Sequence, residues 1–232
     1  MNHSYNNHRR SRHSHQHRPR QNLRRFPDRW DRYDNVGRDI EGTRFVPFKT
    51  PLDDSFFYGK DLPQELQFGV RSLINMARQA NKEIGLVIDL TNTDRYYDKT
   101  EWADHGVKYI KLNCPGHEVD EREDLVEKFI DVVKEFVENP ENGTKLIGVH
   151  CTHGLNRTGY LICRYLIDVE NYTAADAISV FEFYRGHPME RPKYKKSLYD
   201  AELYKKGLLP RQESESTEEG AGDSSAHQTC TP

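Results

Sequence analysis

Long apolar runs are absent from this chain of 232 residues. No stretch approaches the roughly 18 consecutive apolar residues that a helix needs to cross a bilayer, and the first residues lack the apolar segment of a signal peptide. We therefore expect no membrane span and a protein that works inside the cell. Apolar residues make up only 35% of the chain, too few for all of it to pack into a core. One folded domain with polar tails is the simplest organisation.

Cysteines are also few. The four occur at positions 114, 151, 163 and 230, a spacing that fits neither paired metal ligands nor a disulfide framework. Such a set suits a reducing compartment, where a free thiolate persists. The histidines near the start of the chain are too irregularly spaced for a structural zinc site. No metal and no other cofactor is therefore expected.

Acidic residues are missing before Asp28, and residues 1–25 contain five histidines and seven arginines. This composition predicts a disordered basic arm over residues 1–28. The arm either follows a phosphate backbone or is a solvated tail that keeps the protein soluble, and both uses stay open. Residues 209–232 carry Glu and Asp among Ser, Gly and Thr, which predicts a disordered acidic tail. The net charge of −3 thus conceals two ends of opposite charge.

The pattern between residues 29 and 208 is typical of one α/β domain, in which a central, mostly parallel sheet is flanked by helices. Strands are expected at 43–48, 84–90, 108–112 and 145–150, the first of them at an edge. Apolar residues at helical spacing predict helices over 66–77, 125–136, 158–169, 174–184 and 192–205. The helix at 158–169 is apolar on most sides and is expected to be buried. Thr173 is the expected cap of the helix that follows it.

The most informative segment, residues 150–159, reads HCTHGLNRTG and lies between a buried strand and a buried helix. A loop of this length can turn successive backbone N–H groups inward and form a nest for a tetrahedral anion, to which the following helix adds the positive end of its dipole. The residues of this nest are Thr152, His153, Gly154, Leu155 and Asn156. The segment therefore predicts a phosphate-binding site. His150, which points back into the strand, is expected to support the loop by hydrogen bonds.

Cys151 stands at the strand end, inside this field. Thiols in such settings have pKa values of roughly 3.5 to 7.5, so Cys151 is expected to be a nucleophile at neutral pH. Arg157 can hold two phosphoryl oxygens with its planar fork, and Thr158 offers a hydroxyl that stabilises the sulfur as it leaves. Cys114 and Cys163 lack this context and are interpreted as packing residues.

The loop resembles the signature of the cysteine-dependent phosphatases, in which His-Cys is followed by five residues and then Arg-Ser or Arg-Thr. Further stretches resemble the RNA 5′-triphosphatase branch of that superfamily, namely residues 29–30, 42–45, 48–49, 89–93, 95–97, 109–111, 116–117 and 147–164. The branch includes the triphosphatase domain of metazoan mRNA capping enzymes and free-standing phosphatases that act on RNA–protein complexes. The free-standing group is the nearer one, because no guanylyltransferase motif follows.

The resemblance implies a dual-specificity phosphatase fold and a covalent phosphocysteine intermediate. It implies removal of the γ- and β-phosphates from 5′-triphosphate RNA without a metal ion, leaving a 5′-monophosphate. The expected partners are RNA 5′-triphosphate ends and RNA-processing proteins. We expect a monomer in the nucleus, or in nucleus and cytoplasm, with no membrane partner.

Two acidic residues are candidates for the proton donor to a leaving group. Asp120 follows by position, since protein-directed relatives place an acid in a loop before the signature; its alternative role is an ordinary helix cap. Asp89 follows by resemblance to an acidic residue of the capping-enzyme branch; its alternative role is to brace the loop through hydrogen bonds. Both alternatives stay open.

Residues 185–192, which read RGHPMERP, lie where the superfamily folds a segment back over the pocket. Arg191 and Arg185 are therefore candidates to meet the phosphates that are not under attack. The alternative is that they are surface arginines on a helix connection.

Two other functions compete with the RNA 5′-polyphosphatase. A dual-specificity protein tyrosine/serine/threonine phosphatase would use the same chemistry at Cys151 with a different pocket rim. A catalytically silent module that binds RNA 5′ ends is the third hypothesis, and the intact Cys151 and Arg157 argue against it. Hydrolysis of triphosphate RNA and of phosphopeptides at equal concentration separates the three.

Overall fold

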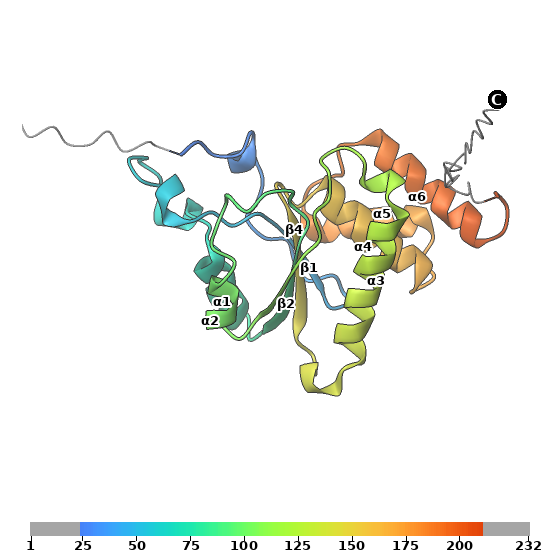
Figure 1. Ribbon diagram of the computed structural model, residues 1–232, viewed down its shortest axis with the longest axis horizontal. Coiled ribbons are helices and arrows are strands. Elements are labelled where there is room, and N and C mark those ends of the chain that lie inside the picture. The colour runs from blue at the N-terminus through green and yellow to red at the C-terminus, as the bar shows by residue number, and fades with distance from the viewer. Residues whose placement is uncertain (1–23, 211–232) are drawn as a thin grey trace, which may run out of the picture.

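The structure, a computed structural model, describes residues 24–210 (Figure 1). Its strands are β1 (Phe45–Lys49), β2 (Ile84–Asp89), β3 (Lys108–Lys111) and β4 (Leu146–Cys151). Its α-helices are α1 (Val70–Gln79), α2 (Glu101–Asp104), α3 (Glu123–Glu138), α4 (Asn156–Asp168), α5 (Ala174–Arg185) and α6 (Pro192–Lys205). Short 3-10 helices are η1 (Trp30–Arg32), η2 (Asp54–Phe56), η3 (Gln64–Leu66), η4 (Val119–Glu121) and η5 (Pro140–Asn142). The predictions for residues 1–23 and 211–232 lie outside the described residues.

The four strands form one parallel sheet in the order β1-β4-β2-β3. The predicted α/β class is therefore confirmed, and β1 lies at an edge as expected. β4 is paired on both sides, so the strand that leads to Cys151 is central. Because all strands run the same way, their carboxyl ends meet at one edge of the sheet, where ligands bind in such folds.

Helices cover both faces of the sheet, with α1 and α2 on one face and α3 to α6 on the other (Figure 1). Successive residues of a strand point to opposite faces, so β2 serves two cores. Leu86 and Ile88 pack into the core under α3 to α6, whereas Val87 packs into the core that holds Trp30 and Trp102. Both tryptophans are almost fully buried. None of the helices within residues 24–210 is long and apolar enough to cross a membrane.

The predicted central helix corresponds to α4, which begins two residues earlier than expected. Leu161, Ile162 and Leu166 are fully buried, and the helix packs against α3, α5, α6 and β4. Thr173 caps α5 as predicted, because its Oγ1 accepts a hydrogen bond of 3.1 Å from the backbone N–H of Asp176. These elements fix the helix dipole of α4 behind the loop that follows β4.

The prediction that Leu66 lies on the first helix is wrong. Leu66 belongs to η3 and is 52% exposed, and α1 begins only at Val70. Gly69 caps this helix, with its backbone N–H donating to Ser72 Oγ at 3.3 Å. A helix that starts at this cap cannot include Leu66.

The last residues of the predicted basic arm, 24–28, are described and pack on the domain. The Phe26 ring lies 5.4 Å from that of Trp30 and 5.7 Å from that of Phe57, and Arg24 forms an ion pair of 2.6 Å with Asp53. Residues 24–28, which the charge pattern assigns to the disordered arm, therefore pack on the domain, mainly through the Phe26 ring.

Candidate active site

The segment between β4 and α4 is the strand–loop–helix unit that the sequence predicts. Gly154 has a φ of +67°, and a Cβ at this position would lie 2.1 Å from the Phe48 carbonyl oxygen. Only glycine allows this turn and this approach to β1. The loop backbone is further tied to the chain after β1 by a 3.2 Å hydrogen bond from the Thr50 N–H to the Thr152 carbonyl.

The thiol of Cys151 is buried at the base of this loop. Burial works to raise its pKa, but the charge of Arg157, the hydroxyl and N–H of Thr158, and the N–H of His153 outweigh burial and lower the pKa to about 7. A thiol with this pKa is about half ionised at neutral pH, which supplies a substantial thiolate fraction. The predicted position of a nucleophilic thiolate is thus built from loop N–H groups, one hydroxyl and one guanidinium.

Arg157 is held in place by three acceptors. Its Nη1 donates to the carbonyls of Leu90 at 3.0 Å and Cys114 at 2.9 Å, and its Nη2 donates to Thr152 Oγ1 at 3.1 Å. These carbonyls follow β2 and β3, so the sheet itself orients the guanidinium plane. A fork fixed in this way suits two oxygens of a phosphoryl group.

His150 is fully buried and supports the loop as predicted. Its Nε2 lies 2.8 Å from the Tyr97 hydroxyl, and its Nδ1 lies 3.4 Å from the Cys151 carbonyl oxygen. Burial lowers the pKa of His150, so the imidazole is neutral at physiological pH. A neutral ring locked between these groups is a brace for the strand end.

Asp89 lies at the end of β2 and is 2% exposed. Its carboxylate accepts hydrogen bonds from Thr91 N–H at 2.7 Å, Tyr97 OH at 3.1 Å, Tyr109 OH at 2.9 Å and Lys111 Nζ at 3.0 Å. Burial works to raise the pKa of Asp89, but the charge of Lys111 and the hydrogen bonds from Thr91 outweigh burial and lower it. An ionised, fully bonded carboxylate has no proton to donate, so these contacts are those of the bracing alternative.

Asp120 lies in η4, and its side chain is 3% exposed. Oδ2 pairs with Lys193 Nζ of α6 at 3.3 Å, and Oδ1 is buried without a partner among residues 24–210. The side chain does not cap α3, whose N-cap residue Arg122 makes no side-chain cap bond. The alternative role of Asp120 as a helix cap is therefore wrong, and Asp120 remains the candidate acid.

Arg185 does not lie at the rim, contrary to the sequence-based hypothesis. The residue is 1% exposed, and it donates to the loop carbonyls of Gly154 and His153 at 3.0 Å each and to that of Asp34 at 2.8 Å. Burial lowers its pKa to about 10. Arg185 supports the loop from behind, because the last turn of α5 points toward the loop carbonyls rather than outward.

Arg191, at the start of α6, lies at the rim and is partly exposed. Asn156 Oδ1 accepts the backbone N–H groups of Glu190 at 2.9 Å and Arg191 at 3.1 Å, which fixes this segment beside the loop. The Arg191 Nη1 lies 2.7 Å from Nδ1 of His117, in the segment between β3 and η4. Arg191 thus joins two segments that border the loop.

The sequence of residues 66–203 matches the family model of the dual specificity phosphatase, catalytic domain. The chain belongs to the dual-specificity phosphatase family. The phosphatase family predicted from the loop is therefore confirmed. Two relatives described in the next paragraph have names that match the suspected branch.

The chain is 76% identical over 198 residues to the RNA/RNP complex-1-interacting phosphatase homolog of Caenorhabditis elegans, covering 84% of this chain and 85% of that protein. It is 48% identical over 180 residues to the RNA/RNP complex-1-interacting phosphatase of Homo sapiens, covering 78% and 53%. A probable tyrosine-protein phosphatase of C. elegans is 40% identical over 175 residues, with 75% and 48% covered. The phosphatase thus spans about half the length of the last two relatives.

Among solved structures, a mutant form of Tk-PTP is similar to this phosphatase with a TM-score of 0.53. The two chains are 18% identical, and the similarity covers 74% of this chain and 97% of the other. At this identity the likeness shows the fold alone.

Sequence reasoning missed several buried polar groups around the site of this phosphatase. Lys49 is 3% exposed and pairs in register with Cys151. Its Nζ donates to the carbonyls of Trp30 at 3.1 Å and Tyr33 at 2.8 Å, and burial and then the charge of Arg185 lower its pKa to about 8. The signal that could have found Lys49 is a lysine ending an apolar strand that pairs with the catalytic strand.

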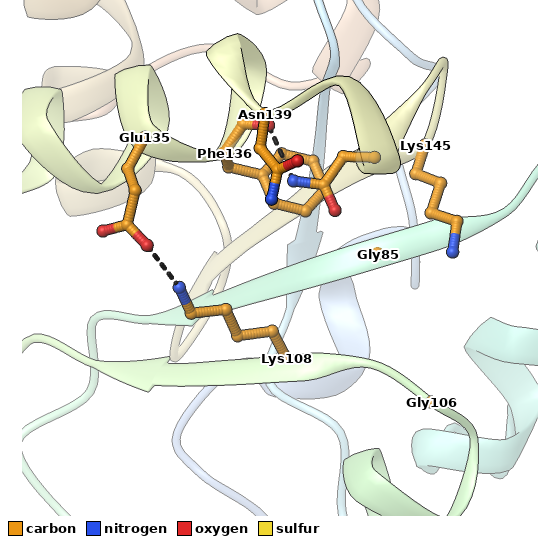
Figure 2. A pocket seen from close by; sticks show the side chains of 8 residues that line it. Gly85, Gly106, Lys108, Glu135, Phe136, Asn139 and Lys145 are labelled. Atoms are coloured by element: carbon orange, nitrogen blue, oxygen red, sulfur yellow. Dashed lines mark hydrogen bonds and ion pairs between the residues drawn. The ribbon is translucent and has the colours of Figure 1, made fainter.

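The phosphatase also has a hollow of about 200 Å³ at the far edge of the sheet (Figure 2). Gly85 and Lys108 near the starts of β2 and β3 line it, together with Phe136 near the end of α3. Lys108 pairs with Glu135 at 2.9 Å, as the dashed line shows. None of the loop residues lines this hollow, and the phosphatase chemistry belongs to the opposite edge.

Proposed function

We propose that the chain is an RNA 5′-polyphosphatase that removes the γ- and then the β-phosphate from 5′-triphosphate RNA and leaves a 5′-monophosphate. The observation that carries the proposal is a second guanidinium, that of Arg191, at the rim of a loop built to hold one phosphoryl group. Two similar relatives are named for interaction with an RNA/RNP complex, which supports RNA as the substrate class. A nuclear location and association with RNA-processing proteins belong to the same proposal.

The first step transfers a phosphoryl group to sulfur. The Cys151 thiolate attacks the terminal phosphorus, an S–P bond forms, and the bond between that phosphorus and the bridging oxygen breaks. Arg157 and the loop N–H groups hold the equatorial oxygens as charge shifts. Water then attacks the phosphocysteine, the S–P bond breaks, and inorganic phosphate leaves, while the Thr158 hydroxyl stabilises the returning thiolate.

The leaving group explains where the reaction stops. The first two steps expel a diphosphate or phosphate oxygen, which carries charge well without a proton. Removal of the last phosphate expels a sugar alkoxide, for which a positioned acid contributes typically about 10²- to 10⁴-fold. Asp89 is ionised, and Asp120, the remaining candidate acid, is held by an ion pair with Lys193 rather than being free to follow the leaving group. We therefore expect the 5′-monophosphate to accumulate.

A dual-specificity protein phosphatase is the second candidate, favoured by the relative named a probable tyrosine-protein phosphatase. The test measures hydrolysis of RNA labelled at the γ- or β-phosphate against phosphotyrosine and phosphothreonine peptides at equal concentration. Release of both labels with a final 5′-monophosphate supports the proposal. A preference for the peptides would replace it with the second candidate, and accumulation of 5′-hydroxyl RNA would overturn the leaving-group argument.

A further inference from the structure

Three aromatic side chains form a cluster beside the catalytic loop, called here the rim cluster: Tyr33, His153 and His187. The Tyr33 ring lies 5.2 Å from the His153 ring and 5.4 Å from the His187 ring. All three residues are partly exposed. His153 belongs to the catalytic loop, two residues after Cys151, and its side chain packs on Tyr33. The cluster therefore begins at the phosphate site itself.

Hydrogen bonds fix each ring of the cluster in place. The Tyr33 hydroxyl donates to Glu190 at 2.5 Å. His153 Nε2 lies 2.6 Å from the Asp28 carbonyl oxygen, and the backbone N–H of Asp34 donates to His187 Nε2 at 3.1 Å. The rings are therefore held in place before any ligand binds. For this reason they lose little conformational freedom when a flat group stacks on them.

Basic and acidic groups both border the rim cluster, and the Asp34 carboxylate lies 3.1 Å from His187 Nε2. Arg29 donates to both oxygens of Glu190, at 3.2 and 3.1 Å, so this carboxylate is already neutralised. The Arg29 guanidinium also lies 5.9 Å from the centre of the Tyr33 ring. Arginine beside exposed aromatic rings is the combination with which proteins bind single-stranded nucleic acid, through stacking on bases and charge on the backbone.

We propose that the rim cluster stacks the base of the first nucleotide of the RNA while its 5′-phosphates lie in the loop, with Tyr33 as the central ring. This inference rests on the proposed function, since it assigns the nucleotide next to the phosphates. It explains how a loop that binds any phosphoryl group distinguishes a nucleic acid end from other phosphates. Tyr33 is then a residue that touches the substrate and determines specificity.

The test compares three substrates: triphosphate RNA, the same RNA with an abasic first nucleotide, and inorganic triphosphate. With the unmodified protein, kcat/KM is expected to be higher for the base-bearing RNA than for the abasic one. Tyr33→Leu is expected to reduce this ratio roughly 5- to 150-fold, the range that stacking of one base contributes. Tyr33→Phe keeps the ring and loses only the hydrogen bond to Glu190, so it should keep the ratio. Tyr199→Leu removes an exposed tyrosine of α6 and serves as the matched control.

If Tyr33→Leu lowers kcat/KM equally for all three substrates, the inference is overturned, because Tyr33 would then only support the loop. A second measurement needs no turnover. The affinity of 5′-monophosphate RNA, either base-bearing or abasic, is determined for the Cys151→Ser protein and for the same protein that also carries Tyr33→Leu. A base-dependent affinity that vanishes with Tyr33→Leu supports the rim cluster even if triphosphate hydrolysis fails, whereas no base dependence overturns it. Failure of the unmodified protein to cleave triphosphate RNA would overturn only the proposed function.

Discussion

Cys151 and Cys114 are both buried near Arg157, yet their thiols differ in acidity. Burial dominates at Cys114 and raises its pKa to about 12, whereas the pKa of Cys151 is lowered to about 7. The difference comes from Thr158 and the backbone N–H of His153, which act to lower the pKa of Cys151 and have no such effect at Cys114. The acidity of these two cysteines is therefore set by the loop around the thiol and not by the degree of burial.

The lowered pKa predicts the pH dependence of Cys151 alkylation. Below its pKa a thiol keeps its proton, so the reactive thiolate should fall roughly tenfold for each pH unit below about 7 and reach a plateau above it. The rate of iodoacetamide labelling from pH 5 to 9, read by mass spectrometry, gives this curve. Cys151→Ser is the control and should also abolish turnover, because an alcohol is not ionised near neutral pH. A midpoint near 9 would contradict the proposed role of the loop.

Arg191→Ala is predicted to act on polyphosphate ends. Its guanidinium can bind the phosphates that are not under attack, and a hydrogen bond to a charged group contributes enough for roughly a 10- to 150-fold loss in kcat/KM on triphosphate RNA. The loss on p-nitrophenyl phosphate, which has no second phosphate, should be much smaller. Arg78→Ala, in the last turn of α1, is the matched control. Equal losses on both substrates would place Arg191 in the support of the loop.

The strand–loop–helix element depends on Gly154 and its approach to β1. Gly154→Ala places a Cβ 2.1 Å from the Phe48 carbonyl oxygen, a backbone atom that cannot move away. We expect a loss of at least about 3 kcal/mol in the free energy of unfolding, together with loss of activity. Gly42→Ala has a similar φ of +76° with nothing within 4 Å of the added Cβ, and should cost only about 1–2 kcal/mol. Denaturant unfolding of both variants measures the difference, and equal costs would contradict the steric argument.

The regular elements could be predicted because their signals are local. Apolar runs located β2 and β4, and helical spacing located α3 to α6, each from neighbouring residues. Arg185 was misplaced because the side of α5 from which it reaches the loop depends on packing. The signature residues Cys151 and Arg157 were found because their spacing within one loop carries the chemistry.

The network around Asp89 shows why the rest of the site escapes prediction. Tyr97, Tyr109 and Lys111 come from the chain after β2 and from β3, and they meet Asp89 only because these strands pair in parallel register. Sequence stretches that contain them supported the family resemblance, yet gave no indication that they share one carboxylate. Contacts between distant segments are a property of the assembled sheet.

At the scale of the whole molecule, the opposite charges of the two ends predict a role for residues 1–23. Their removal should weaken binding of long RNA and flatten its dependence on salt, because each lost phosphate contact lowers the slope by about 0.7 for a single strand. Turnover of a nucleoside triphosphate should barely change. Binding isotherms at several salt concentrations measure the slope, and removal of residues 213–232 is the matched control. Identical slopes would mean that the basic segment is only a solvated tail.

The chain contains two tryptophans, and their burial gives the phosphatase an optical signal. The Trp30 indole N–H donates to the Thr50 carbonyl at 2.8 Å, and the Lys49 ammonium lies 3.6 Å from the centre of the Trp30 ring. The Trp102 indole N–H has no partner among residues 24–210, so Trp102→Phe removes no hydrogen bond seen there. In that variant the emission spectrum comes from Trp30 alone, next to the chain that ties β1 to the loop. Titration with inorganic phosphate would then be followed by intrinsic fluorescence without any added dye.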